Sequence, residues 1–192
     1  MSKRTKDELL AALRELDARL VSAGLEIEIR AIGGFALLVH GVRAGARAYT
    51  ADIDTVTADY PPQVVAMVAE VGADLGLDPD WLNNYNVMDG DAEHVELLIG
   101  AEWEPMALAG APLRAIALSV ASVATLTRAK RMAVEDAAMS GRAQDAPDLV
   151  ELVQHQGIAS MSQYDARYPD DWDEFPAARA AVRRWLSQRP AA

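Results

Sequence analysis

The sequence predicts an α/β (α+β) fold in which a mixed, twisted sheet is followed by a C-terminal helical part. Two observations support this class. Short apolar segments with β-strand character alternate with helical patterns as far as residue 118. From residue 119 onwards only helical patterns follow, separated by Gly and Pro. We therefore predict an α/β core over residues 1–118 and a helical region over residues 119–192.

The first elements surround a glycine pair. Leucines recur at spacings of three and four within residues 5–22, which predicts an amphipathic helix. A strand at residues 25–32 follows and ends on Gly33-Gly34. A short apolar helix at residues 35–40 comes next, and a β-rich segment at residues 50–57 closes this stretch.

The middle of the chain is predicted from turn residues and apolar runs. A helix begins at Pro61-Pro62, since Pro is tolerated in a first helical turn. Residues 78–90 are rich in turn formers and predict a loop. The apolar run His94–Ile99 predicts a strand, and two more strands are expected at residues 106–109 and 113–118.

The C-terminal region predicts helices whose ends are marked by Ser, Gly and Pro. The first begins near Ser119 or Ser122, where Ser suits an N-cap. We expect helices over residues 122–139, 145–156 and 161–168, and a last one from Glu174 or Pro176 to Gln188.

The composition is that of an ordinary water-soluble globular protein, with half of the residues apolar and a quarter charged. No apolar run approaches the ~20 residues that span a bilayer, so we expect no membrane association. The N-terminal residues lack the apolar segment of a secretory signal. Cysteine is absent, which excludes disulfides and thiolate zinc sites. We expect a cytoplasmic protein.

Asp52 and Asp54 are the leading candidates for a metal site. Alternate side chains of a strand share a face, so the two carboxylates are expected to project together. Paired carboxylates suit a hard divalent cation such as Mg²⁺. Gly33 and Gly34, at the start of a helix, can offer backbone N–H groups to an anion. The stretch therefore predicts a combined phosphate and magnesium site.

The same residues resemble the nucleotidyltransferases of the DNA polymerase β superfamily, and most closely the AbiEii and MenT-type toxins. In that family a Gly-Ser or Gly-Gly helix start precedes the pattern R-x-T-x-D-I-D, and Thr50, Asp52, Ile53 and Asp54 fit it. Arg47 stands three rather than two residues before Thr50. The resemblance implies a polymerase β-like core, an NTP substrate, Mg²⁺, and nucleotide binding by Gly33, Gly34, Arg47 and Thr50. It also implies a third carboxylate from a later strand; Glu96 is the candidate, and a water-facing edge-strand Glu is the alternative.

A second group of residues extends the resemblance to about residue 155. The family carries a Lys on a helix after the sheet and then the pattern R-x-x-D-x-x-D-L, which Arg142, Asp145, Asp148 and Leu149 reproduce. The resemblance implies catalytic roles for Lys130 and Asp145, with Asp148 as the second choice and a nucleotide contact. The alternatives are a surface Lys on an amphipathic helix and acidic residues that favour a helix N-terminus.

The resemblance implies that the acceptor is the 3′ end of tRNA, and that the protein is a toxin with a cognate antitoxin. A protein or small-molecule acceptor, or a non-catalytic nucleotide- or protein-binding module, remains an alternative. The net charge is −11, and no Lys or Arg lies between Arg47 and Arg114, which disfavours broad nucleic-acid binding. RNA would have to approach the remaining basic residues, namely Arg43, Arg47, Arg128, Arg131 and Arg142. Trp81 and Tyr85 are candidates either for base stacking or for fixing their loop to the core.

Overall fold

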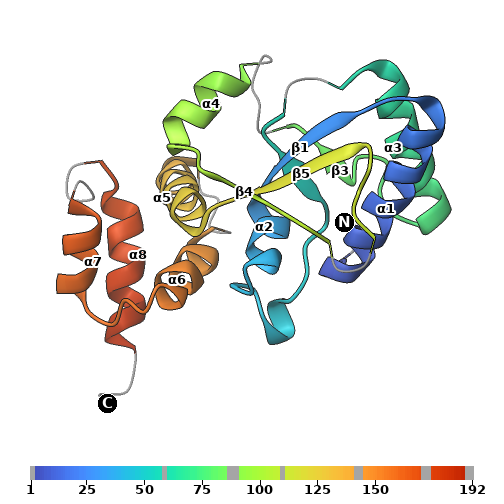
Figure 1. Cartoon of the computed structure of the whole chain (residues 1–192). Helices are drawn as coiled ribbons and strands as arrows, with labels where there is room; N and C mark the ends of the chain where they lie inside the picture. The colour runs from blue at the N-terminus through green and yellow to red at the C-terminus, as the bar shows by residue number, and fades with distance from the viewer. Residues whose placement is uncertain are drawn as a thin grey trace. The chain divides into compact units, whose positions relative to one another are not determined.

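The computed structural model describes residues 3–57, 60–85, 91–108, 111–140, 145–169 and 174–188. These residues form eight α-helices and a five-stranded mixed sheet, which confirms the predicted α/β class (Figure 1). The chain divides into two compact units, residues 1–122 (unit 1) and residues 123–192 (unit 2). None of the helices in the described ranges is long and apolar enough to cross a membrane.

Helix α1 (Lys6–Ala23) forms where the leucine pattern predicts it. Thr5 caps its start in a capping box with Glu8, and Gly24 ends it in the left-handed conformation, with φ of 66°. One face of the helix is fully buried, and that face carries Leu9, Leu13, Leu16 and Leu20. The regular spacing of these leucines therefore fixes which side of α1 belongs to the core of unit 1.

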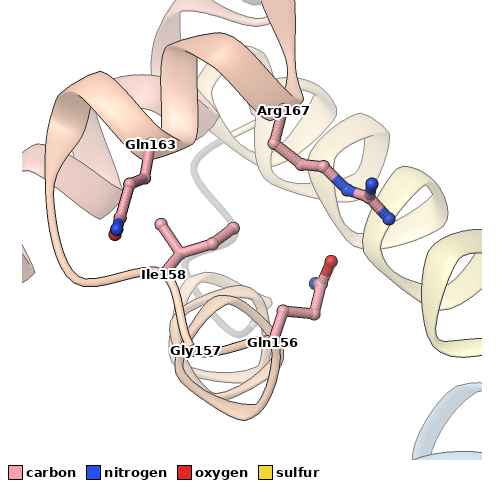
Figure 2. Close-up of a pocket in the computed structure, with 5 residues that line it drawn as sticks. All are labelled: Gln156, Gly157, Ile158, Gln163 and Arg167. Carbon is pink, nitrogen blue, oxygen red and sulfur yellow. The ribbon is translucent and has the colours of Figure 1, made fainter.

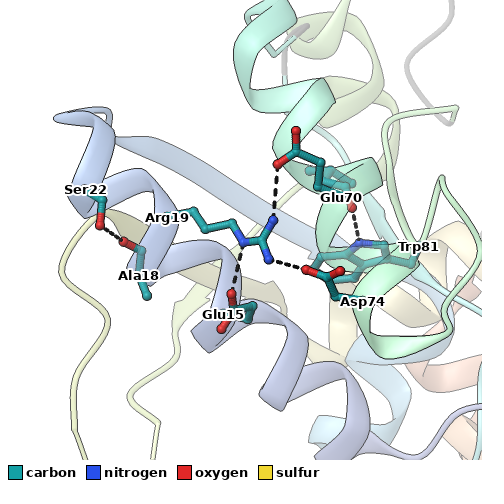
Figure 3. Close-up of polar contacts among 8 residues, drawn as sticks. Glu15, Ala18, Arg19, Ser22, Glu70, Asp74 and Trp81 are labelled. Carbon is teal, nitrogen blue, oxygen red and sulfur yellow. Dashed lines mark hydrogen bonds and ion pairs between the residues drawn. The ribbon is translucent and has the colours of Figure 1, made fainter.

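Helix α3 (Pro62–Leu75) lies beside α1 (Figure 1). Arg19 of α1 joins the two helices, because its guanidinium contacts Glu15 at 3.0 Å, Glu70 at 3.2 Å and Asp74 at 2.5 Å (Figure 3). Exposed ion pairs of this kind contribute little stability individually. The Arg19 contacts therefore join the two helices but contribute little to the stability of unit 1.

The sheet of unit 1 places the predicted site at its centre. Its strand order is β3 (Leu82–Asn83), β2 (Ile53–Thr55), β1 (Ile27–Ile32), β5 (Ile116–Ala121) and β4 (Trp103–Pro105). β1 runs parallel to β5 and antiparallel to β2, and β2 runs parallel to β3. The chain leaves β1 directly into helix α2 (Gly33–Val39), beside the end of β2 that carries Asp54.

The prediction of a strand at His94–Ile99 was wrong, because these residues belong to helix α4 (Ala92–Ile99). The Asp91 side chain accepts a hydrogen bond from the His94 N–H at 2.9 Å, which caps the helix at its start. Gly100 ends it with φ of 57°. Glu96, the candidate for a third carboxylate from a later strand, therefore lies on a helix and not on a strand.

The other strands of the middle region are displaced from their predicted positions. β4 occupies residues 103–105 rather than 106–109, and β5 begins at Ile116 rather than at residue 113. The later start of β5 has a physical cause. The Asp17 carboxylate accepts hydrogen bonds from the backbone N–H groups of Arg114, Ala115 and Ile116. In the predicted loop, Leu82 and Asn83 pair with β2 as β3, while residues 86–90 lie outside the described ranges.

Unit 2 contains the four helices that the sequence predicts, namely α5 (Val123–Ser140), α6 (Ala146–His155), α7 (Met161–Arg167) and α8 (Pro176–Ser187). Its core is built on fully buried residues of α6, α7 and α8, which are Leu149, Val153, Tyr164, Ala178 and Val182. Arg131 of α5 is 5% exposed, and its guanidinium lies 4.6 Å from both the Tyr168 and the Phe175 rings. Arg131 is thus a core residue and is not available to dock RNA.

Candidate active site

The Gly33 turn holds the carboxylate of Asp54 against the end of β1. Asp54 stands opposite Ile32 in the antiparallel β1–β2 pair. Gly33 has φ of 68°, and a Cβ atom on it would lie 2.6 Å from Asp54 Oδ2. Both the left-handed backbone and the close approach require glycine. The turn and the carboxylate are therefore in direct contact, as the predicted site needs.

Gly34 closely approaches two further side chains, those of Thr50 and Arg43. A Cβ atom here would lie 2.2 Å from Thr50 Oγ1 and 2.7 Å from Arg43 Nη1. Thr50 is 7% exposed and is fixed by two backbone hydrogen bonds with Arg4, of 2.7 and 2.9 Å. The glycine turn thus has a carboxylate beside Gly33, and a hydroxyl and a guanidinium beside Gly34.

Asp52 shares the face of Asp54. Asn83 of β3 stands opposite Asp54 in the parallel register, so the two side chains lie on one face of the sheet. The Asn83 side-chain amide donates a 3.4 Å hydrogen bond to Asp52 Oδ2. Asp52 therefore lies on that face too, as the alternation along the segment predicts.

The electrostatics of the pair favour a cation. Burial and, to a smaller extent, the negative charges of Asp54 and Asp80 raise the pKa of the half-buried Asp52 to about 6, while the hydrogen bond from Asn83 opposes them. A carboxylate with this pKa is mostly ionised at neutral pH but poorly stabilised by its surroundings. A bound divalent ion would remove that unfavourable interaction.

The donor set fits Mg²⁺ that arrives with phosphates. Within the described ranges, no group of three or more His, Cys, Asp or Glu side chains that could hold a metal comes together. Mg²⁺ is commonly held by one or two carboxylates, with water and substrate phosphates as its other ligands. Asp52 and Asp54 meet that requirement without a third protein carboxylate.

Glu96 does not join the aspartates. Its carboxylate forms an ion pair with Arg30 of β1, which also contacts Glu28 at 3.0 Å. Because Glu96 lies on α4, this contact attaches the helix to the sheet. Its charge is used in fold stabilisation, so we do not assign it as a metal ligand.

Arg47 is not the arginine nearest to the glycines. It lies at the end of the short 3-10 helix η1 (Gly45–Arg47), while the atoms closest to Gly34 belong to Thr50 and Arg43. Sequence reasoning missed both Arg43 and Asn83 as site residues. The motif spacing pointed to Arg47, and Asn83 is brought to the site by a two-residue strand that carries no periodic signal.

Unit 2 brings together three of the residues that were predicted as a second group. Lys130 Nζ lies 2.5 Å from Asp145 Oδ1 and 3.0 Å from Asp148 Oδ2. The Lys130 side chain is 14% exposed and that of Asp148 is 2% exposed. Lys130 is thus no ordinary surface lysine, because its ammonium is held by two carboxylates at the start of α6. Arg142 lies outside the described ranges.

The two loop aromatics behave differently. Trp81 is fully buried and its indole N–H donates to the Val68 carbonyl at 2.8 Å, so it fixes the loop to α3 (Figure 3). Tyr85 is 72% exposed, and its hydroxyl donates to Asp80 at 3.1 Å. Of the two, only Tyr85 is placed where a base could stack on it.

Unit 2 also contains a cavity of about 480 Å³ at the end of α6. Gln156, which caps the end of α6, lines it together with Gln163 and Arg167 of α7 (Figure 2). None of the predicted site residues lines this cavity.

Comparisons of the chain with models of protein families, with curated proteins and with solved structures each gave no match. Any functional conclusion therefore depends on the chemistry of the residues described above and on the motif resemblance.

Proposed function

We propose that the protein is a Mg²⁺-dependent nucleotidyltransferase that moves a nucleotide from an NTP to an acceptor. One observation carries the proposal: two consecutive glycines closely approach site side chains, Gly33 the Asp54 carboxylate and Gly34 the Thr50 hydroxyl, with Asp52 on the same face as Asp54. The glycines allow these side chains to lie against the start of α2, where backbone N–H groups can meet phosphates. The resemblance to AbiEii and MenT-type enzymes adds support, since these residues are the ones that carry it.

In the proposed reaction an acceptor hydroxyl oxygen bonds to the α-phosphorus of the NTP. The bond from that phosphorus to its bridging oxygen breaks, pyrophosphate leaves, and the hydroxyl proton is released. Mg²⁺ supplies charge neutralisation for the phosphates and lowers the pKa of the attacking hydroxyl. Asp52 and Asp54 hold the ion, and Gly33 and Gly34 receive the phosphates through backbone N–H groups.

Lys130 and Asp145 are proposed to take part in transfer on the strength of the resemblance. A compact ammonium suits a phosphate oxygen whose charge grows during the reaction. The contacts with Asp145 and Asp148 hold the Lys130 side chain in one conformation, which favours such a role. A purely structural role for the ammonium is the competing explanation.

The acceptor is proposed to be the 3′ end of tRNA, with the protein acting in the cytoplasm as the toxin of a toxin–antitoxin pair. This step depends on the resemblance, because a fold does not dictate an acceptor. The excess of acidic residues favours the competing acceptors, a protein hydroxyl or a small molecule. A non-catalytic nucleotide-binding module is the remaining alternative.

The decisive experiment incubates the protein with each α-³²P-labelled NTP and Mg²⁺, in the presence of total RNA or cell protein. We expect Mg²⁺-dependent label on RNA, lost with EDTA and with Asp54→Asn. Label on protein or on a small molecule would name a different acceptor for the same chemistry. Absence of transfer from all four NTPs, with nucleotide still bound, would leave the binding-module alternative.

A further inference from the structure

Arg43 lies at the glycine turn although the sequence motif does not include it. Its Nη1 atom is 2.7 Å from the position of a Cβ on Gly34. The same atom donates to the Tyr49 carbonyl at 3.1 Å. The guanidinium is therefore beside the turn that is proposed to receive phosphates, whereas the motif spacing points to Arg47.

The backbone on both sides of Arg43 is anchored. The N–H groups of Val42 and Arg43 donate to the Leu37 carbonyl at 2.9 and 3.3 Å, which folds the link back over the end of α2. At the far end of the link, Thr50 is paired with Arg4. The half-buried Arg43 side chain is therefore held at the turn by local structure, so little ordering is needed when a ligand binds.

The charges around the turn match a metal-bound phosphate ligand. Asp54 touches the Gly33 side, where a cation would sit, and Arg43 touches the Gly34 side. A site for a bare divalent ion gains nothing from a guanidinium nearby, because the two cations repel. A ligand that carries both Mg²⁺ and phosphate oxygens satisfies both sides, and the planar guanidinium suits bidentate contact with phosphate.

We propose that Arg43, and not Arg47, is the arginine that binds the triphosphate of the NTP. This inference depends on the proposed nucleotidyl transfer, since it places the substrate's phosphates between Arg43 and the aspartate pair. Arg43 acts on the phosphates alone, so its contribution is independent of the base and of the acceptor.

The test measures binding of magnesium tripolyphosphate by calorimetry, because this probe avoids the unknown base preference. The variants are Arg43→Lys, Arg43→Gln, Arg47→Gln and, as a charge-matched control on an exposed side chain, Arg114→Gln. Arg43→Gln is expected to lose affinity by about 10- to 100-fold, the range for a charge-assisted hydrogen bond. Arg43→Lys should lose less, since it keeps the charge but not the planar fork. Arg47→Gln and Arg114→Gln should differ from wild type by less than about threefold.

The Gln and Lys variants separate phosphate binding from a structural role. Gln and Lys both keep an N–H donor that can meet the Tyr49 carbonyl, but only Lys keeps the positive charge. Equal losses of affinity in Arg43→Gln and Arg43→Lys, with lowered thermal stability, would therefore indicate a structural arginine and overturn the inference. Wild-type affinity in Arg43→Gln, or the main loss in Arg47→Gln, would also overturn it while leaving the proposed function standing. No binding by the wild type would remove both.

Discussion

The charge of Asp52 makes the stability of the metal-free protein depend on pH. Its pKa is raised to about 6 in the folded protein, against an ordinary value of about 4. Well below pH 4 the Asp52 carboxyl group is protonated in both the folded and the unfolded chain, so it does not lower the free energy of unfolding. As the pH rises from 4 to 6, the unfolded chain loses this proton first, so the stability of the folded state falls.

We therefore expect Asp52→Asn to be more stable than wild type at pH 7.5 in EDTA, by about 1 kcal/mol after allowance for solvent screening of a half-exposed group. The difference should vanish at pH 3, where the carboxyl group is protonated in both the folded and the unfolded chain. Urea denaturation at the two pH values measures it.

Addition of Mg²⁺ provides the control for this variant. The ion should stabilise the wild type at pH 7.5 and have little effect on Asp52→Asn, because one of the two carboxylate ligands is gone. A wild type that is as stable at pH 7.5 as Asp52→Asn, and indifferent to Mg²⁺, would contradict the assignment of the pair.

Gly33 can be tested against a glycine of the same conformation. Gly33→Ala and Gly41→Ala share the cost of a positive φ, since the two angles are 68° and 70°, and each should lose about 1–2 kcal/mol. Only at Gly33 does the new methyl group also meet a carboxylate oxygen. Gly33→Ala should therefore abolish transfer and lose more stability, measured by denaturation and the labelled-NTP assay. Equal effects of the two substitutions would show that the contact with Asp54 is unimportant.

At the residue scale, the part of the site within one continuous stretch was readable from the sequence. Strand alternation places Asp52 and Asp54 on one face, and the glycine pair after β1 marks the start of a helix. The contact between Gly33 and Asp54 additionally requires the antiparallel β1–β2 pairing. Asn83 reaches Asp52 only because a two-residue strand pairs with β2, and Arg43 reaches Gly34 only because its link folds back over α2. Such approaches depend on tertiary pairing, which spacing along the chain does not encode.

Among the elements, the long amphipathic helices were predicted well and the short apolar run at His94–Ile99 was not. A six-residue apolar run has too little length to distinguish a strand from a buried helix turn. The caps held the missing information, because Asp91 and Gly100 bracket the segment as an N-cap and a left-handed C-cap do. The apolar residues alone favour a strand, whereas the two boundary residues indicate a helix.

The α5–α6 contact gives a prediction at the scale of elements. Lys130→Ala removes the ammonium that faces Asp145 and the nearly buried Asp148. We expect a loss of about 3 kcal/mol in unfolding free energy, since the burial cost of the Asp148 charge is then less well offset. Chemical denaturation followed by the circular dichroism signal measures it.

Loss of transfer in Lys130→Ala would therefore not by itself establish a catalytic lysine. The double variant Lys130→Ala/Asp148→Asn removes the buried charge as well and should recover much of the stability. If Lys130 acts in transfer, the double variant stays inactive although it is folded. Recovered transfer together with recovered stability would assign Lys130 a structural role.

Across the whole molecule, the negative charge is concentrated in one unit. Residues 1–122 contain nineteen acidic and nine basic residues, whereas residues 123–192 contain ten and nine. A polyanion would therefore be repelled far less by unit 2. Of the basic residues predicted to meet RNA, Arg131 is excluded by its burial against two aromatic rings, so its reversal to Glu would test folding instead.

The exposed arginines of α7 and α8 allow a cleaner test of an RNA acceptor. The triple variant Arg167→Gln/Arg183→Gln/Arg184→Gln removes three positive charges from surface positions of unit 2. If RNA binds this surface, transfer to RNA should weaken, and the slope of log K against log salt should become shallower by about 0.7 for each RNA phosphate that an arginine no longer neutralises. Binding of magnesium tripolyphosphate should remain unchanged, because none of these three arginines is among the proposed phosphate ligands. The double variant Arg14→Gln/Arg114→Gln, which alters exposed positions of unit 1, serves as the control and should leave the salt slope as it is. An unaltered slope in the triple variant would mean that RNA does not bind α7 and α8, and a protein or small-molecule acceptor would then be favoured.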